Sequence, residues 1–76
     1  MKTYQFDIES GAIGTREVLD AADDAAAVRQ ALLLLSEILR DHALVARGDM
    51  EVRIRVRDAA GRRIWDGVSS VQASVR

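Results

Sequence analysis

Residues 22–46, ADDAAAVRQALLLLSEILRDHALVA, decide the fold of this chain of 76 residues. Apolar side chains recur in this stretch at steps of three and four residues, which places them in one stripe along an α-helix. The stripe consists of Val28, Ala31, Leu32, Leu35, Ile38 and Leu39. Such a stripe must be covered by another part of the protein, and the segments on both sides of the helix are suited to that role.

The ends of this helix are marked by capping residues. Asp20 and Asp23 both precede it, and a short carboxylate accepts hydrogen bonds from the free N–H groups of a first helical turn. Gly48 is the stop signal, so we expect the helix to end between Asp41 and Arg47.

The flanking segments alternate apolar and polar residues, as half-buried strands do. Residues 3–10 place Tyr4, Phe6 and Ile8 on one face. A turn with two glycines at residues 10–14 and a short returning strand at residues 15–19 follow. Residues 50–58 alternate most regularly, and their buried face consists of Met50, Val52, Ile54 and Val56.

A second hairpin is predicted after residue 58. The sequence Asp58-Ala59-Ala60-Gly61 is typical of a type I turn that ends in a left-handed glycine. This turn would place Asp58 opposite Arg62, Val56 opposite Ile64 and Arg55 opposite Trp65. We expect a bulge at Asp66-Gly67 that returns Val68 to the buried face, and frayed residues at 69–76.

Together these elements predict one domain, residues 1–76, because a chain this short has material for only one core. We expect an α+β fold in which one helix packs on a four-stranded, mainly antiparallel sheet with connectivity ββαββ. With strands numbered along the chain, the sheet orders 2-1-3-4 and 2-1-4-3 both fit. The side chains expected in the core are Tyr4, Phe6, Ile8, Val28, Ala31, Leu32, Leu35, Ile38, Leu39, Val52, Ile54, Val56 and Ile64.

Composition narrows the class of protein. The formal net charge of −1 provides no overall attraction to nucleic acid or to anionic membranes. The absence of cysteine excludes disulfides, thiolate metal sites and a cysteine nucleophile. The first ten residues lack the apolar segment of a secretory signal, and the longest apolar run, Ala31–Leu35, is too short to span a bilayer. We therefore expect a cytoplasmic protein without a membrane partner.

Four short motifs, in this order and spacing, resemble a family of small bacterial proteins known only as a domain of unknown function and common in alphaproteobacteria. They are YQFDI at residues 4–8, AAVRQAL at 26–32, EILRD at 37–41 and VRDAAGR at 56–62. The chain departs from the family at Gln5, where a second aromatic residue is usual, and before the helix, where a proline is usual. The resemblance implies a ββαββ domain and no catalytic residues.

Arginines form the most suggestive polar feature. Arg53, Arg55 and Arg57 share one face of a predicted strand at a spacing of roughly 6.5–7 Å, which is comparable to the phosphate repeat of a nucleic acid. Arg62, Arg63 and Trp65 follow across the turn, and the indole could stack on a base. The alternative interpretation is an exposed sheet face whose arginines pair with Asp7, Glu9 and Glu51.

Leucines also fall outside the predicted core. Leu33 and Leu44 project from the polar side of the helix and Leu34 lies on its flank. Several exposed leucines on a small protein indicate a contact surface, and the limited core of a short chain also favours a homodimer.

No catalytic or metal-binding arrangement is apparent. His42 is the only histidine, with Asp41 and Asp49 as its nearest acidic neighbours, so we interpret it as a helix-end residue and expect no metal site. Adjacent Asp23 and Asp24 diverge on a helix, and the serines have no partner base. We expect neither a cofactor nor an enzymatic activity.

The sequence therefore favours a small non-catalytic protein-interaction module that self-associates as a homo-oligomer, most simply a dimer, or binds another protein. Either a sheet edge or the surface of Leu33, Leu34 and Leu44 would make the contact. The alternative is a nucleic-acid-binding module that uses the arginine-rich strand 53–57.

Overall fold

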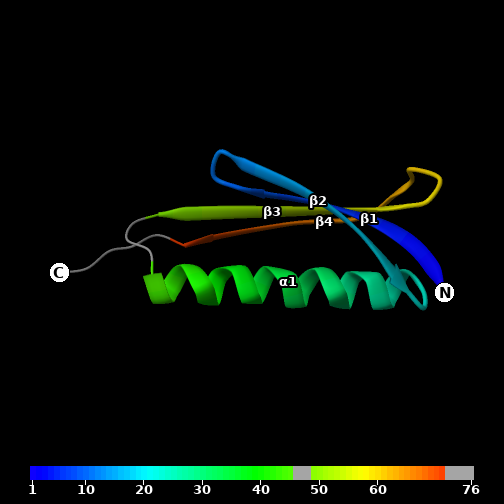
Figure 1. Ribbon diagram of the computed structural model, residues 1–76, viewed down its shortest axis with the longest axis horizontal. Helices are drawn as coiled ribbons and strands as arrows, with labels where there is room; N and C mark the ends of the chain where they lie inside the picture. Colours follow the sequence, from blue (N-terminus) through cyan, green and yellow to red (C-terminus); the bar gives the residue numbers. More distant parts are fainter. Residues whose placement is uncertain (46–48, 72–76) are drawn as a thin grey trace.

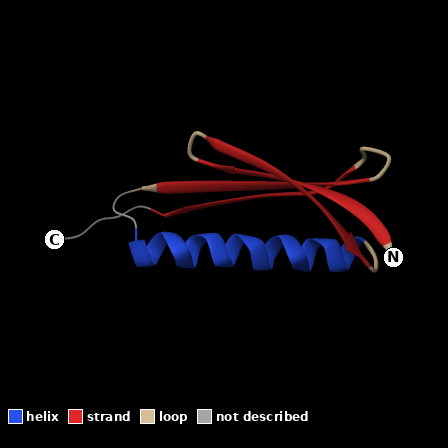
Figure 2. Cartoon of the chain, in the orientation of Figure 1, coloured by secondary structure: helices blue, strands red, loops and turns tan. Residues whose placement is uncertain are grey.

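The computed structural model describes residues 1–45 and 49–71, and it describes the side chains of all of these except 42–45 and 71. The elements are, in order, β1 (Lys2–Ser10), β2 (Ile13–Ala21), α1 (Asp24–Val45), β3 (Met50–Asp58) and β4 (Arg63–Val71). The strands form one antiparallel sheet in the order β2-β1-β3-β4, and α1 runs along one face of it (Figures 1 and 2). The predicted α+β fold is confirmed, with the sheet order 2-1-3-4 and not 2-1-4-3.

Strand β2 is longer than the sequence indicated and its turn is tighter. It pairs with β1 from Ser10 opposite Ile13 to Lys2 opposite Ala21, so only Gly11 and Ala12 form the turn. Gly11 has a positive φ of 61°, as the first central residue of a type II′ turn requires. Gly14 was predicted to belong to the turn, but it lies within β2 opposite Glu9.

The turn between β3 and β4 has the predicted form. Gly61 has a φ of 83° and its N–H donates to the carbonyl of Asp58 at 2.9 Å. The Oδ1 atom of Asp58 accepts the N–H groups of Ala60 at 3.0 Å and Arg62 at 2.8 Å. These hydrogen bonds favour the carboxylate form, and the bond from Arg62 contributes most to lowering the pKa of Asp58 below its usual 3.8.

Asp23 is the N-cap of α1. Its Oδ1 atom accepts the N–H of Ala26 at 2.8 Å, which satisfies one of the free donors of the first turn. The other candidate, Asp20, stays in β2 and accepts a hydrogen bond from the hydroxyl of Thr3 at 2.9 Å. Tyr4 ties the sheet to the helix by donating to Asp24 at 2.6 Å, and this hydrogen bond, together with burial, raises the pKa of Tyr4 to about 12.

The core lies between α1 and the two central strands. Tyr4, Phe6, Val52, Ile54 and Val56 are fully buried, and Ile8 is nearly so. The helix contributes Ala27 and Ala31 to this layer, and it packs mainly against β3. Small side chains at these two positions let the helix approach the sheet closely.

The apolar stripe of the helix is rotated relative to the prediction. Leu32 was predicted to be buried but is 49% exposed, because it projects about 100° around the helix from the buried Ala31. Ala27 and Ala21 are buried instead, although neither was predicted. Half-buried side chains complete the core, namely Leu19, Ala26, Leu34, Leu35, Ile38, Leu39, Met50, Ile64 and Trp65.

The predicted register of β3 and β4 is wrong after the turn. Arg57 lies opposite Arg63 but Val56 lies opposite Trp65, so Ile64 is an extra residue in β4. This bulge takes the place of the one expected at Asp66-Gly67. Arg55 consequently faces Asp66 and not Trp65, and Val68 is 51% exposed instead of returning to the buried face.

Candidate functional site

The face of the sheet that points away from α1 carries nearly all of its charge. The strand registers place Arg16, Asp7, Arg55 and Asp66 in one row across all four strands. Among the described residues this face has five arginines and five acidic residues, so its charges balance. They are Arg16, Arg53, Arg55, Arg57 and Arg63, with Asp7, Glu9, Asp20, Glu51 and Asp66.

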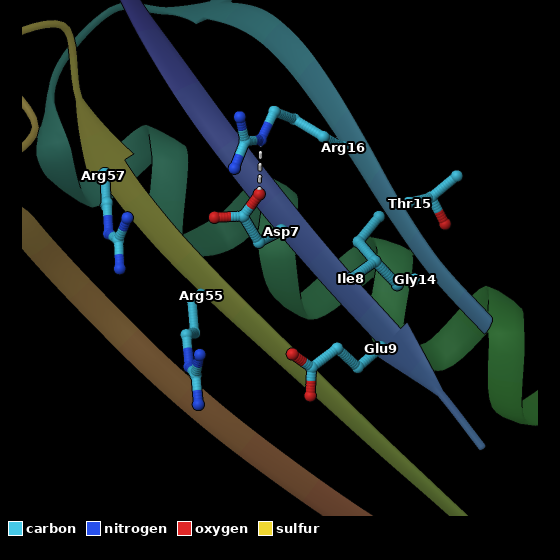
Figure 3. A pocket seen from close by; sticks show the side chains of 8 residues that line it. All are labelled: Asp7, Ile8, Glu9, Gly14, Thr15, Arg16, Arg55 and Arg57. Carbon is cyan, nitrogen blue, oxygen red and sulfur yellow. Dashed lines mark hydrogen bonds and ion pairs between the residues drawn. The ribbon is translucent and has the colours of Figure 1, made fainter. Parts of the chain in front are cut away.

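Alternating charges along this row pair with one another. Arg16 Nε donates to Asp7 Oδ1 at 2.8 Å (Figure 3). Arg55 Nε lies 3.8 Å from Asp66 Oδ2. The hydrogen bond from Arg16 is the largest cause that holds the pKa of Asp7 below its usual 3.8. Asp7 is therefore a structural carboxylate and not a group poised to exchange a proton near neutral pH.

The three arginines of β3 lie on this face as predicted. A shallow hollow of about 490 Å³ extends beside them, lined on its polar side by Asp7, Glu9, Arg16, Arg55 and Arg57 (Figure 3). Within the part of the chain that the structure describes, Arg53 and Arg57 form no ion pair within 4.0 Å. Glu9 lies opposite Arg53 on β1, and Glu51 lies two residues before Arg53 on β3, but neither forms a close ion pair within the described structure.

Of the other members of the predicted arginine surface, Arg63 lies opposite Arg57 on the same face, whereas Arg62 and Trp65 are separated from it. Arg62 lies at the turn, where its guanidinium is 3.2 Å from Asp58 and 3.6 Å from Asp24. Trp65 shares the face of the buried Val56, on the helix side of the sheet, because the bulge at Ile64 shifts it by one position. The predicted stacking of Trp65 beside Arg55 is therefore incorrect.

The predicted leucine surface is only partly assembled. Leu33 is 57% exposed, and it lies next to Leu32, the unexpectedly exposed residue of the helix. Leu34 packs against the core and is not available as an outer contact. The side chains of Leu44 and His42 lie outside the described part of the structure.

An edge that the sequence did not single out is more regular than either surface. All nine residues of β2 pair with β1, without a bulge, and no described segment pairs with the other side of β2. Residues 13–18 and 20 are exposed, with Ile13 at 72% and Val18 at 62%. The sequence signal is Arg16-Glu17-Val18-Leu19-Asp20, in which the helix face and the outer face both carry charge, as edge strands often do.

No cluster of three metal-ligating side chains occurs among the residues that the structure describes. Across the same residues, no helix combines the length and the apolar character needed to cross a membrane.

Comparison with known proteins gave one match. A family model described as a domain of unknown function, DUF6894, matches residues 3–67. The searches among curated proteins and among solved structures each found no match.

Proposed function

The chain belongs to the DUF6894 family, whose function is unknown, and we propose that it is a non-catalytic protein-interaction module that self-associates through the open edge of β2. The observation that carries this proposal is the regular, exposed and unpaired ladder along that strand. Edge strands present free N–H and C=O groups, and proteins normally block them with bulges, prolines or covering loops. Along β2 the chain has none of these among the described residues, and the protection that it does carry is charge, at Arg16, Glu17 and Asp20.

The small size of the core also favours self-association. A domain of 76 residues buries only about 60% of the surface of its unfolded chain, so its stability is limited. Its only fully buried large side chains are Tyr4, Phe6, Ile54, Val52 and Val56 among the described residues. Pairing of β2 with a second strand would add main-chain hydrogen bonds and cover the exposed Val18.

Light scattering after size exclusion tests this proposal. We expect a species of twice the 8.4 kDa mass of one chain, which dissociates on dilution and weakens far less with salt than a nucleic-acid complex would. Main-chain hydrogen bonds and apolar contacts are only weakly screened, so only the contribution of exposed charge pairs should fall with salt. A mass of 8.4 kDa at every protein concentration up to the millimolar range would contradict the proposal.

Nucleic-acid binding is a second candidate, supported by Arg53 and Arg57, which have no close ion pair in the described structure. We favour it less because Asp7 and Asp66 alternate with the arginines across the sheet, and because Trp65 lies on the other face. Titration with a short mixed-sequence oligonucleotide separates the two proposals. Binding through this face would weaken steeply with salt and would be lost in Arg53→Gln/Arg57→Gln.

A further inference from the structure

The backbone hydrogen bonds of the first hairpin determine which groups of β2 point outward. The N–H of Gly11 donates to the carbonyl of Glu51 in β3 at 3.4 Å, so the backbone groups of the preceding residue, Ser10, face β2. Ser10 lies opposite Ile13, whose own backbone groups therefore face β1. Because this direction alternates along a strand, the free N–H and C=O groups of the open edge belong to Gly14, Arg16, Val18 and Asp20.

Three of these residues, Arg16, Val18 and Asp20, also place their side chains on the outer face of the sheet, opposite the helix. Arg16, Val18 and Asp20 therefore follow one another on a single face, as a cation, an apolar side chain and an anion. When such a strand is turned through 180° about its central residue, the cation of one copy faces the anion of the other. The edge is self-complementary about Val18.

From this we infer the register of association, an inference that rests on the function proposed above. The geometry points to antiparallel pairing of β2 with β2 of a second copy, centred on Val18, with Arg16 of each copy opposite Asp20 of the other. The product is a continuous eight-stranded sheet, twice the four strands of one chain, that carries both helices on the same side. The two Val18 side chains meet at its centre.

Competing registers are disfavoured by charge. The three antiparallel alignments with the greatest overlap are centred on Arg16, Glu17 and Val18. Centring on Arg16 places two guanidinium groups opposite each other, and centring on Glu17 does the same with two carboxylates. Only centring on Val18 combines opposite charges on both sides of an apolar pair.

The side chains required for these pairs have atoms available. Arg16 contacts Asp7 through Nε, and its guanidinium lies over β1 (Figure 3), so this 63% exposed side chain turns toward the open edge when it pairs with a second copy. Asp20 accepts the hydroxyl of Thr3 on Oδ1, and its Oδ2 atom has no hydrogen bond within the described structure. In the dimer each Arg16 would pair with Asp20 of the second copy in place of Asp7 of its own chain.

A charge-exchange experiment tests the register. In Arg16→Asp both facing positions become acidic in the homodimer, and in Asp20→Arg both become basic. The dimer dissociation constant of each variant alone should therefore be about tenfold or more above that of the wild-type protein. Mixing the two variants restores two opposite-charge pairs in the heterodimer. We therefore expect the equimolar mixture to recover the dimer mass, measured by light scattering, close to the wild-type concentration dependence.

Arg63→Asp is the matched control, since it makes the same charge change on the same face at the other edge of the sheet and should leave the dimer unchanged. Circular dichroism of each variant verifies folding. If the wild-type protein is a dimer but mixing does not restore association, the register is wrong while self-association stands. If the wild-type protein is a monomer, the proposed function itself fails.

Discussion

The two edges of the sheet differ in how well they are protected. At β4, the bulge at Ile64 breaks the regular spacing, and the half-buried Trp65 packs over Gly67 so closely that a Cβ atom there would overlap the indole. At β2, nothing lies within 4 Å of the corresponding position on Gly14, and the ladder is regular throughout. The same sheet therefore has one edge that a bulge interrupts and one edge whose ladder is regular throughout.

This difference shows that protection of an edge depends on a few residues and not on overall composition. Both edge strands contain charged residues and one exposed valine on the outer face, Val18 at 62% and Val68 at 51%. What distinguishes them is one extra residue in β4, which changes twist and pairing locally. The central strands β1 and β3 lie between the two edges. A substitution in their buried core therefore provides the reference against which the effects of edge substitutions are compared.

The largest effect is expected from Ile54→Asp, in the interior that both edges share. Ile54 is fully buried, and an unpaired carboxylate there should lower the free energy of unfolding by about 4 kcal/mol or more, enough to unfold the domain. The edge control, Val68→Asp, should change it by less than about 0.5 kcal/mol. Urea unfolding monitored by circular dichroism measures both, and a folded Ile54→Asp protein would contradict the assignment of the core.

The next largest effect is expected from Gly67→Ala, on the edge strand β4. The added methyl group must displace the indole of Trp65, so we expect destabilisation of about 1–2 kcal/mol and a red shift of the fluorescence of this single tryptophan. Gly14→Ala at the open edge is the matched variant. It meets no atom within 4 Å, and it should change neither stability nor fluorescence. Equal effects of the two substitutions would remove the distinction between the edges.

A smaller effect is expected from Val18→Lys, which places a charge at the centre of the proposed pairing. The dimer dissociation constant should be about tenfold above that of the wild-type protein, because two ammonium groups would meet at the twofold axis. Val68→Lys makes the same change on β4, at the other edge of the sheet, and should leave the dimer intact. Sedimentation equilibrium of the two variants decides the point, and greater weakening by Val68→Lys would assign the contact to β4 instead.

The smallest effect concerns acid stability near the open edge. Because the folded-state pKa of Asp7 is lowered, its contribution to stability is complete above its ordinary pKa of 3.8 and is lost as the pH falls through the lowered value. Arg16→Gln removes the main cause, so the pKa of Asp7 in the folded protein, measured by NMR titration, should rise toward 3.8. An unchanged pKa would mean that the ion pair at 2.8 Å does not act as described.

Much of the fold was predictable because it is encoded locally. The alternation of β1 and β3, the cap at Asp23 and the left-handed Gly61 each depend on neighbouring residues, and each is confirmed. The exposure of Leu32 was not predictable in this way. A helix with apolar residues over more than one face can turn either side to a sheet, and here the small Ala27 and Ala31 allow the closest approach.

The candidate site was harder to predict, because it depends on pairing between distant segments. A bulge of one residue moves Trp65 from the arginine face to the core, and nothing in residues 62–67 alone distinguishes Ile64 from Gly67 as its position. Both sheet orders expected from the sequence place β2 outermost, but its length and regular pairing over Ile13–Ala21 were not expected, because only a short strand at residues 15–19 was predicted. Leu33 is exposed, as predicted, and Leu34, which was placed on the flank of the helix, is half-buried against the core.

Disulfide formation by Val18→Cys tests the central claim most directly. The wild-type chain has no cysteine, so the variant has one thiol, and pairing centred on residue 18 would bring the two Cα atoms to about 5.5 Å, within the range for a disulfide. We predict that mild oxidation converts Val18→Cys to a covalent dimer, whereas Arg16→Cys and Val68→Cys remain mostly monomeric on a non-reducing gel. Faster cross-linking of Arg16→Cys or Val68→Cys than of Val18→Cys would contradict association through β2 centred on Val18.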